Sequence, residues 1–414
     1  MLETSTQAGL DVRADFPILS RELEGGRLVY LDSSSTSQKP AAVLDALDDY
    51  YRNHNANIHR GVYKLAQEAD ALFEGARERI AAFVNHPVAS TIFTRNVTEA
   101  INLVAYSWAR TNLRPGDAVL ISEMEHHSNI VPWQLATAAT GAELRYLEVS
   151  PTDGTLSLEQ LDRELARGDV ALLALTHISN VLGTINPVEE IVRRAHAAGA
   201  LALIDGAQAV PQLPLDLAAI DADFYAWTGH KALGPTGVGV LHARAELLEQ
   251  MPPFLSGGDM IATVEAQRST WNALPWKFEA GTSMIAQVVG LGAAVDYLDS
   301  LGMAAVRAHE QALTADALER LARIDGVSLF GPPAAEDRGG VISFALAGIH
   351  PHDVAEILSR SNVCIRASHH CAQPLMRRLG VNATARASFG PYNVAADVDA
   401  LAEAIGRAQE VFAG

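Results

Sequence analysis

Between residues 92 and 241 the sequence alternates short, wholly apolar runs with longer amphipathic segments. Apolar runs without interspersed polar residues predict strands that are buried on both faces, and the amphipathic segments predict helices that cover them. This order predicts an α/β fold with a mainly parallel, seven-stranded sheet. The predicted strands are 92–94, 118–121, 144–149, 170–175, 201–204, 224–227 and 238–241, and the predicted helices are 98–108, 131–140, 158–166 and 188–198.

The length of 414 residues predicts two domains, because single cores rarely organise so long a chain. We expect an N-terminal segment (1–20), a large domain (21–290) and a smaller C-terminal α/β domain (291–414). The large domain should begin with a short strand and two helices, at 28–32, 40–52 and 67–84. The small domain should contain strands at 327–330, 341–345, near 364–366 and 384–386, and helices at 289–301, 353–360 and 396–412.

Charge and cysteine content exclude several classes of protein. Lys and Arg number 31 against 49 Asp and Glu, a net charge of −18, which argues against a broad nucleic-acid surface. Two cysteines make no disulfide framework and favour a reducing cytoplasm. No signal peptide is visible, and no apolar run approaches the roughly 20 residues that span a bilayer. We therefore expect a soluble, cytoplasmic protein that binds neither nucleic acid nor membrane.

Five of the predicted strands are followed by unusually polar loops. Ligands of parallel α/β sheets bind beyond the carboxyl ends of the strands, so these loops should meet at one edge of the sheet. Such a convergence predicts an active site. The loops are Arg95–Thr98, Glu123–Asn129, Thr176–Asn180, Asp205–Gln208 and Thr228–Lys231.

Lys231 lies in the last of these loops, between two strand-like runs. Its side chain either extends to water or is a desolvated amine with a lowered pKa, suited to form a Schiff base with an aldehyde. Pyridoxal phosphate (PLP) is the common aldehyde cofactor, and it needs a carboxylate at the ring nitrogen, a flat partner for the ring, donors for the phenolic oxygen and a phosphate site. Asp205 is the candidate partner of the ring nitrogen, and His126 is the candidate partner of the ring. Gln208 and Asn180 are candidate donors to the phenolic oxygen. The candidates for the phosphate site are Val97, Thr98, Thr228 and His230.

Six motifs resemble those of one known family. They are Glu125–Trp133 (EHHSNIVPW), Thr176–Gly183 (THISNVLG), Asp205–Gln208 (DGAQ), Thr228–Lys231 (TGHK), Phe278–Thr282 (FEAGT) and His369–Leu375 (HHCAQPL). The chain resembles the group II, Suf-type cysteine desulfurases of the class V aminotransferase group, and selenocysteine lyase-like enzymes share this pattern. The resemblance implies a PLP-dependent transferase of fold type I that is a homodimer with active sites at the subunit interface.

The resemblance also implies a reaction and partners. L-cysteine, or alternatively L-selenocysteine, would be the substrate, L-alanine the product, and a Suf-type protein would accept the sulfur for iron–sulfur cluster assembly or another sulfur pathway. Lys231 would be the Schiff-base lysine, His126 the residue stacked on the ring, Cys371 the nucleophile that becomes a persulfide, and Arg386 the residue that binds the substrate carboxylate.

Other residues receive roles in the same way. Asn180 and Arg366 would assist at the substrate, and Thr282 would reach the phosphate from the other subunit. His59 and Arg60 form a basic pair in a polar loop and are further substrate-binding candidates, whose alternative is a solvated turn. The sequence also departs from the family pattern. Ser34 and Ser35 replace small residues, often two alanines, and Ser368 replaces a glycine, which should stiffen the loop before Cys371.

Two cysteines compete for the role of nucleophile. Cys364 lies in an apolar alternation that predicts a strand, where a buried thiol acts as a small hydrophobe with a raised pKa. Cys371 follows two histidines in a polar loop that can reach the edge of the sheet, although a solvent-exposed bystander is the alternative. We predict that Cys371 is the nucleophile.

Two functions from other classes remain open. The glycines between 229 and 239 suggest a phosphate-binding NTPase, but they lack the Gly-x-x-x-x-Gly-Lys-Ser/Thr spacing. His369, His370 and Cys371 suggest a metal-bound sulfur carrier, but three adjacent ligands suit a tetrahedral site poorly.

Overall fold

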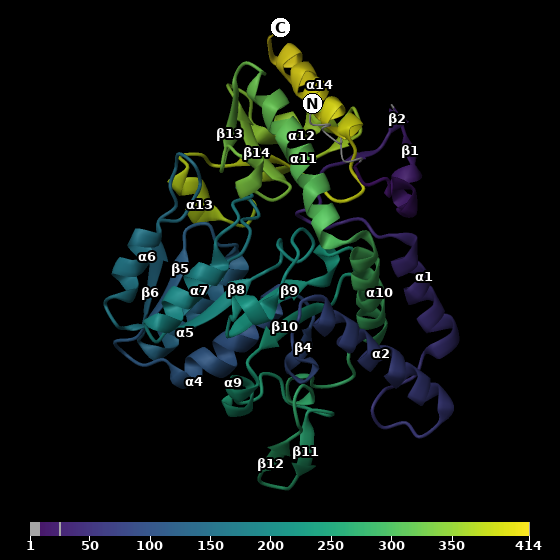
Figure 1. Cartoon of the computed structure of the whole chain (residues 1–414), viewed down its shortest axis with the longest axis vertical. Coiled ribbons are helices and arrows are strands. Elements are labelled where there is room, and N and C mark those ends of the chain that lie inside the picture. Colours follow the sequence, from purple (N-terminus) through teal and green to yellow (C-terminus); the bar gives the residue numbers. More distant parts are fainter. Residues whose placement is uncertain (1–8, 25, 414) are drawn as a thin grey trace, which may run out of the picture.

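The computed structural model describes residues 9–24 and 26–413 (Figure 1). The first eight residues of the predicted N-terminal segment, Gly25 and Gly414 therefore lie outside the described residues.

The centre of the molecule is a seven-stranded sheet in the order β4-β10-β9-β8-β7-β5-β6. Strand β10 is antiparallel to both of its neighbours, and the pairs from β9 to β6 are all parallel. The predicted mainly parallel α/β sheet is thus confirmed. The strands are β4 (Thr91–Thr94), β5 (Ala118–Ser122), β6 (Glu143–Leu147), β7 (Val170–Thr176), β8 (Leu201–Asp205), β9 (Phe224–Thr228) and β10 (Gly239–Ala243).

Helices cover both faces of this sheet, which explains why its strands are apolar throughout. In β8, Leu203 packs into the core on one face and Ile204 into the core on the other. The first face is covered by α3 (Val97–Leu103), α4 (Arg110–Asn112), α5 (Val131–Thr140) and α9 (Ala245–Gln250). The second is covered by α2 (Lys64–Phe83), α6 (Leu158–Leu165), α7 (Val188–Ala197), α8 (Leu217–Ile220) and α10 (Ile285–Leu301), with α1 (Ala41–Asp49) packed on α10.

The C-terminal region forms a second sheet, antiparallel and four-stranded, in the order β13-β14-β17-β16 (Figure 1). Its core is built with the long helices of the same region. The strands are β13 (Val327–Phe330), β14 (Val341–Leu346), β16 (Arg366–Ser368) and β17 (Thr384–Ser388), and the helices are α11 (Met303–Ala322), α12 (Pro351–Ser359), α13 (Gln373–Arg378) and α14 (Ala395–Ala413).

The N-terminal region lies beside this second sheet rather than the first, and its strand β3 belongs to a separate two-stranded sheet. β3 (Val29–Tyr30) pairs in parallel with β15 (Val363–Cys364), and the amide of Ser388 donates to the carbonyl of Leu31. The strand predicted near 364–366 is therefore divided between two sheets. This pairing places the polar loop after β3 beside the C-terminal strands, and the domain boundaries at 20 and 290 stay predictions.

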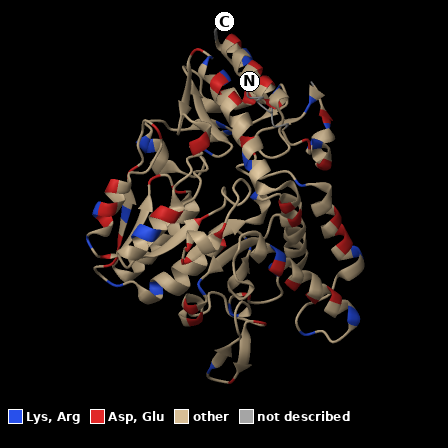
Figure 2. Ribbon diagram, viewed as in Figure 1, with Lys and Arg blue, Asp and Glu red and all other residues tan. Residues whose placement is uncertain are grey.

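Two short hairpins complete the fold. They are β1 (Glu22–Leu23) with β2 (Gly26–Arg27), and β11 (Ile261–Val264) with β12 (Ser269–Trp271), the latter at the bottom of Figure 1. Within residues 9–24 and 26–413 no single helix is long and apolar enough to cross a membrane, although the bent pair α10–α11 passes that criterion jointly. Acidic and basic residues are interspersed over the outer helices (Figure 2).

Candidate active site

A cavity of about 280 Å³ lies at the carboxyl ends of the parallel strands, where the C-terminal sheet meets the first sheet. It brings together residues from positions 34 to 386, and most of the predicted site residues line it. Its predicted members are Val97, Thr98, His126, Asn180, Asp205, Gln208, Thr228, His230, Lys231, Arg366, Cys371 and Arg386.

Lys231 ends a short turn that follows β9, and its side chain is half-buried in this cavity. Burial lowers the pKa of Lys231 to about 8, although the nearby carboxylate of Asp205 opposes this shift. A lysine in such surroundings keeps a larger neutral fraction than a surface lysine. The amine is therefore suited to nucleophilic and proton-transfer chemistry.

Asp205 is the last residue of β8 and faces Thr176 of β7 in the parallel register. The side chain is 3% exposed, and its Oδ1 accepts the amide of Ala207 at 3.0 Å. Burial raises the pKa of Asp205, while the Ala207 amide and Lys231 act in the opposite direction. A buried carboxylate with one weak partner is stabilised by a cationic or proton-bearing group in front of it.

His126 follows β5 and contacts the cavity with its ring. Its Nδ1 bonds the hydroxyl of Ser128, which fixes the ring orientation. Burial, and secondarily the charge of Lys231, lowers the pKa of His126 to about 3. The imidazole is therefore neutral at physiological pH, and a neutral flat ring can stack on an aromatic cofactor.

The start of α3 forms the far end of the cavity. Asn96 caps this helix by accepting the amide of Glu99 at 3.0 Å, which leaves the amides of Val97 and Thr98 at the helix start. Gly239 of β10 permits this arrangement, because a Cβ there would lie 2.6 Å from the Cα of Asn96. The neighbouring hydroxyl of Thr228 is buried without a hydrogen-bond partner among the described residues.

This partnerless hydroxyl provides a test of whether a phosphorylated cofactor fits the site. A buried hydroxyl without a partner costs about 1–3 kcal/mol, which a phosphate oxygen would remove. Helix amides, a hydroxyl and a lysine amine around one cavity form a donor set that suits PLP. The residues of the cavity therefore fit the group.

Cys371 lies on the loop before α13 and lines the same cavity. His370 and Cys371 both adopt left-handed backbone conformations, with φ of 50° and 56°. The Cys371 carbonyl accepts the amide of His127 at 2.7 Å, and the His370 carbonyl accepts Nδ2 of Asn180 at 2.9 Å. Contacts from the first sheet thus hold this loop in an unusual conformation.

The adjacent histidines are engaged in holding the same loop. Nδ1 of His369 accepts the Cys371 amide at 3.1 Å, and Nε2 of His370 donates to Thr384. The Ser368 hydroxyl accepts the His370 amide at 2.8 Å, so its side chain supports the loop, and the predicted stiffening by loss of glycine stays a prediction. Within the described part of the chain, no three His, Cys, Asp or Glu side chains converge as a metal site would require.

Cys364 lies apart from this cavity, in β15. Burial, and secondarily the carboxylate of Asp32, raises the pKa of the Cys364 thiol. A raised thiol pKa lowers the thiolate fraction at neutral pH. The structure therefore places only the other cysteine, Cys371, against the lysine-containing cavity.

Two arginines line the cavity beside Cys371. Nη1 of Arg386 donates to the carbonyl of Asn180 at 2.8 Å and Nη2 reaches Oδ1 of Asp32 at 3.2 Å, but its Nε is buried without a partner among the described residues. Burial lowers the pKa of Arg386 to about 10, against the opposing effect of Asp32. A guanidinium with an unused donor suits a carboxylate ligand.

Three predicted site residues do not line this cavity in the single chain. Thr282 lines a neighbouring hollow together with Asn96 and His230. Nε2 of His59 lies 3.0 Å from Glu74, which raises the pKa of His59, and Nε of Arg60 lies 3.3 Å from Asp259. Their roles at the site stay predictions.

Several lining residues received no individual role from the sequence, although five of them lie in the loops that were predicted to converge. Most of them are sequence neighbours of predicted residues, so the strand-end position was the available signal. For Ser34 and Ser35 the only signal was the departure from the family pattern. The lining residues without a predicted role are Ser34, Ser35, Asn96, Ser128, Thr176, Ile178, Ala207 and His370.

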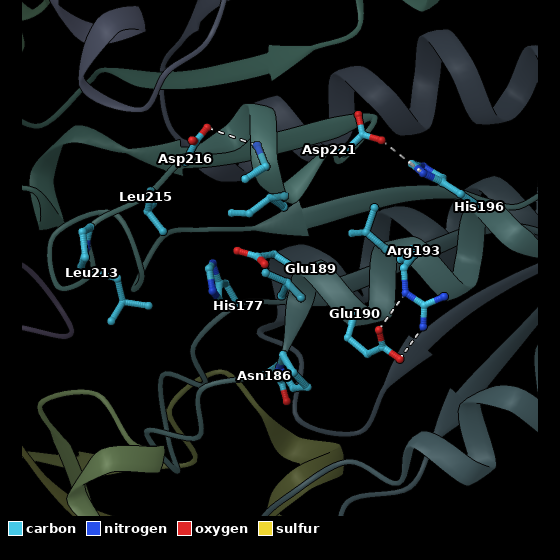
Figure 3. A pocket seen from close by; sticks show the side chains of 16 residues that line it. His177, Asn186, Glu189, Glu190, Arg193, His196, Leu213, Leu215, Asp216 and Asp221 are labelled. Carbon is cyan, nitrogen blue, oxygen red and sulfur yellow. Dashed lines mark hydrogen bonds and ion pairs between the residues drawn. The ribbon is translucent and has the colours of Figure 1, made fainter.

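A larger cavity of about 870 Å³ lies between α7 and the segment 213–221 (Figure 3). His177 reaches into it, with Nδ1 2.9 Å from the hydroxyl of Tyr225, and burial lowers the pKa of His177 to about 4. Figure 3 shows charged pairs such as Glu190–Arg193 along its side. It is lined by neither lysine nor cysteine, so the smaller cavity has the more distinctive chemistry.

Comparisons with known proteins agree with this geometry. The aminotransferase class-V family model matches residues 29–401. A probable cysteine desulfurase of Streptomyces coelicolor is 51% identical over 407 residues, covering 97% of each chain. Among solved structures, the cysteine desulfurase CsdA of Escherichia coli in its S-sulfonic acid form is 39% identical with a TM-score of 0.88, covering 96% of this chain and 98% of its own. An apo cysteine desulfurase of Thermococcus onnurineus is 35% identical with a TM-score of 0.91, covering 97% of each chain.

Proposed function

This chain belongs to the aminotransferase class-V family as one of its cysteine desulfurases, and from this premise we propose that it uses PLP to convert L-cysteine to L-alanine and passes the sulfur atom to Cys371. One observation supports the proposal above the others. A single cavity contains a lysine with a lowered pKa, a buried carboxylate at a strand end, and a cysteine from the C-terminal region.

The residues divide into those that would hold the cofactor and those that would hold the substrate. Thr98, Thr228, His230 and the start of α3 would bind the phosphate. Asp205 would hold a proton on the ring nitrogen, and His126 would lie against the ring, with Gln208 near the phenolic oxygen. Nε2 of Gln208 also donates to the Ser34 carbonyl at 2.9 Å, which fixes its position. When bound, PLP supplies an electron sink for chemistry at the substrate Cα.

The chain's own groups then account for the transfer of sulfur. Arg386 binds the substrate carboxylate, and Lys231 removes the proton from Cα. The Cys371 thiolate forms an S–S bond with the substrate sulfur as the Cβ–S bond breaks, and the electron pair of that bond stays with the carbon skeleton. The skeleton takes up protons and leaves as L-alanine, while Cys371 has become a persulfide.

We further propose a cytoplasmic homodimer that delivers sulfur to a Suf-type acceptor for iron–sulfur cluster assembly. Thr282 lies outside the cavity of its own chain, and this position supports a role at a partner's phosphate site. We propose in the same way that His59 and Arg60, which also lie outside the cavity of their own chain, act at the substrate site of the partner subunit. Sedimentation at several protein concentrations would test the oligomeric state, since a monomer at all concentrations would contradict it.

The main experiment follows cofactor, product and persulfide together. The purified protein, loaded with PLP, is reduced with borohydride and mapped by peptide mass, and we expect a pyridoxyl group on Lys231. A second sample receives L-cysteine, and we expect L-alanine and Cys371 persulfide in equal amounts. A colourless protein that does not bind added PLP would overturn the proposal.

A further inference from the structure

The hydroxyl of Ser35 connects both arginines of the cavity. It accepts Nη2 of Arg386 at 2.8 Å and Nη1 of Arg366 at 3.0 Å. It also donates to Oδ1 of Asp32 at 2.7 Å. A serine hydroxyl has one donor and two acceptor positions, so all three are used.

Arg366 depends on this contact for its place in the cavity. Arg366 is an exposed residue. The Ser35 hydroxyl is the one hydrogen-bond partner of the Arg366 side chain among the described residues. Arg386 differs, because it is 2% exposed and is also held by Asn180 and Asp32. Long, exposed side chains lose conformational entropy when they are held in one position. Without the hydroxyl, Arg366 would have no described bond that directs it toward the cavity.

The Ser35 hydroxyl matters because it lies between two positively charged side chains. Two guanidinium groups near one another repel, and the single carboxylate of Asp32 lies on the Arg386 side of the network. The Ser35 oxygen accepts hydrogen bonds from both cations at once, and the Ser35 hydroxyl donates a hydrogen bond to Asp32. The network is thus already arranged as a two-arginine receptor before any anion arrives, and such preorganisation strengthens binding.

We propose that Ser35 is a positioning residue that holds Arg366 beside Arg386, so that the substrate carboxylate binds between two guanidinium groups. This inference rests on the proposed function, because it takes the α-carboxylate of L-cysteine as the anion. Ser35 itself does not touch the reacting atoms. Its effect should therefore appear in binding rather than in the chemical step.

The test uses Ser35→Ala, which removes the hydroxyl and little else. We expect the KM for L-cysteine to rise about tenfold while kcat stays within about twofold. This pattern follows when a mutation removes binding energy that the substrate and the transition state share equally. Ser35→Thr, which keeps the hydroxyl, should recover most of the affinity. Ser300→Ala, a hydroxyl removal on the exposed end of α10, is the matched control and should behave as the wild type.

Two probes separate carboxylate binding from general damage. In the PLP-loaded enzyme, 3-mercaptopropionate presents a carboxylate and a thiol, and calorimetry should show about tenfold weaker binding to Ser35→Ala. Cysteamine presents an amine and a thiol without a carboxylate, and its affinity, followed by cofactor absorbance, should not change. Equal weakening of both probes would show a merely structural role and overturn the inference.

A double-mutant cycle identifies Arg366 as the residue through which Ser35 acts. In an Arg366→Ala background, Ser35→Ala should add less than about twofold to the KM, because the group that it positions is already gone. Full additivity would contradict the inference. If the wild type itself neither binds PLP nor turns over L-cysteine, the proposed function fails instead, so the two failures are distinguishable.

Discussion

The two walls of the active-site cavity are constructed differently. On the cofactor wall, Asp205 ends a strand of one sheet and His126 and Lys231 follow two other strands of it, and hydrogen-bonded neighbours fix the ends of those strands. On the sulfur wall, Arg366 and Cys371 come from the C-terminal region and Ser35 from the N-terminal region. The bond from Arg386 to Ser35 spans 351 positions of sequence.

Under the proposed function, this difference means that cofactor binding and sulfur capture have separate structural supports. The cofactor wall is part of a continuous parallel sheet, whereas the sulfur wall forms only when distant segments meet. Changes on the first wall should therefore lower the overall turnover of the site. Changes on the second should leave the cofactor in place and impair what happens to the substrate.

The largest effect is expected on the cofactor wall, from Lys231→Ala. Turnover of L-cysteine should fall below about a thousandth of the wild-type rate, because the described cavity is lined by no second lysine. Visible absorbance and alanine formation are the measurements. Lys64→Ala, on an exposed helix end, should retain both, and activity above a few per cent in Lys231→Ala would contradict the assignment.

The sharpest test of the sulfur wall is Cys371→Ser. We expect it to keep the cofactor absorbance of the wild type and to lose persulfide formation. Cys364→Ser is the matched control and should keep both properties, because the Cys364 thiol lies outside the cavity and has a raised pKa. Alkylation and peptide mapping after an L-cysteine pulse would measure this, and the extra sulfur on Cys364 would reverse the choice.

A smaller effect on the cofactor wall is expected from Asp205→Asn. The amide cannot hold a proton on the ring nitrogen, so turnover should fall about a hundredfold while PLP still binds. Steady-state kinetics and PLP titration would be measured together. Turnover near the wild-type rate would mean that Asp205 has only a structural role.

The smallest effect concerns stability rather than activity, in the protein freed of cofactor. The pKa of Lys231 is lowered from 10.5, its ordinary value, to about 8 in the folded protein. The charged lysine therefore destabilises the folded state below pH 8. This destabilisation disappears as the pH rises to 10.5, because the lysine is then neutral when folded. Lys231→Met should therefore raise the free energy of unfolding by about 3 kcal/mol more at pH 7 than at pH 10.5.

Urea unfolding at the two pH values would measure this difference, with Lys64→Met as the exposed control. The methionine also changes apolar burial, but that contribution is independent of pH. If Lys231→Met changed the free energy of unfolding by the same amount at both pH values, Lys231 would not be desolvated in the folded protein.

The sequence predicted the cofactor wall better than the sulfur wall, for a physical reason. Apolar strands and the polar residues after them are local features, so the placement of Asp205 and Lys231 at one sheet edge could be inferred. Bonds between distant segments leave no local pattern. The Ser35 contacts and the division of the 364–366 strand between two sheets therefore became visible only in the structure.

Backbone conformation shows the same limit at Cys371. Left-handed residues are usually predicted from glycine or asparagine, and neither His370 nor Cys371 is of that type. The departure at Ser368 was visible in the sequence, but the left-handed conformation of the two residues after His369 was not. The positions of Thr282, His59 and Arg60 outside the cavity were equally hidden from the sequence.

The left-handed pair at His370 and Cys371 also has a consequence for the C-terminal segment taken by itself. Each such residue costs about 1–3 kcal/mol, so the loop does not keep this shape by itself. His127 and Asn180, which hold it, lie far from Cys371 in the sequence. The loop geometry at the Cys371 thiol therefore depends on contacts with the first sheet, so under the proposed function an isolated C-terminal segment should not be competent to capture sulfur.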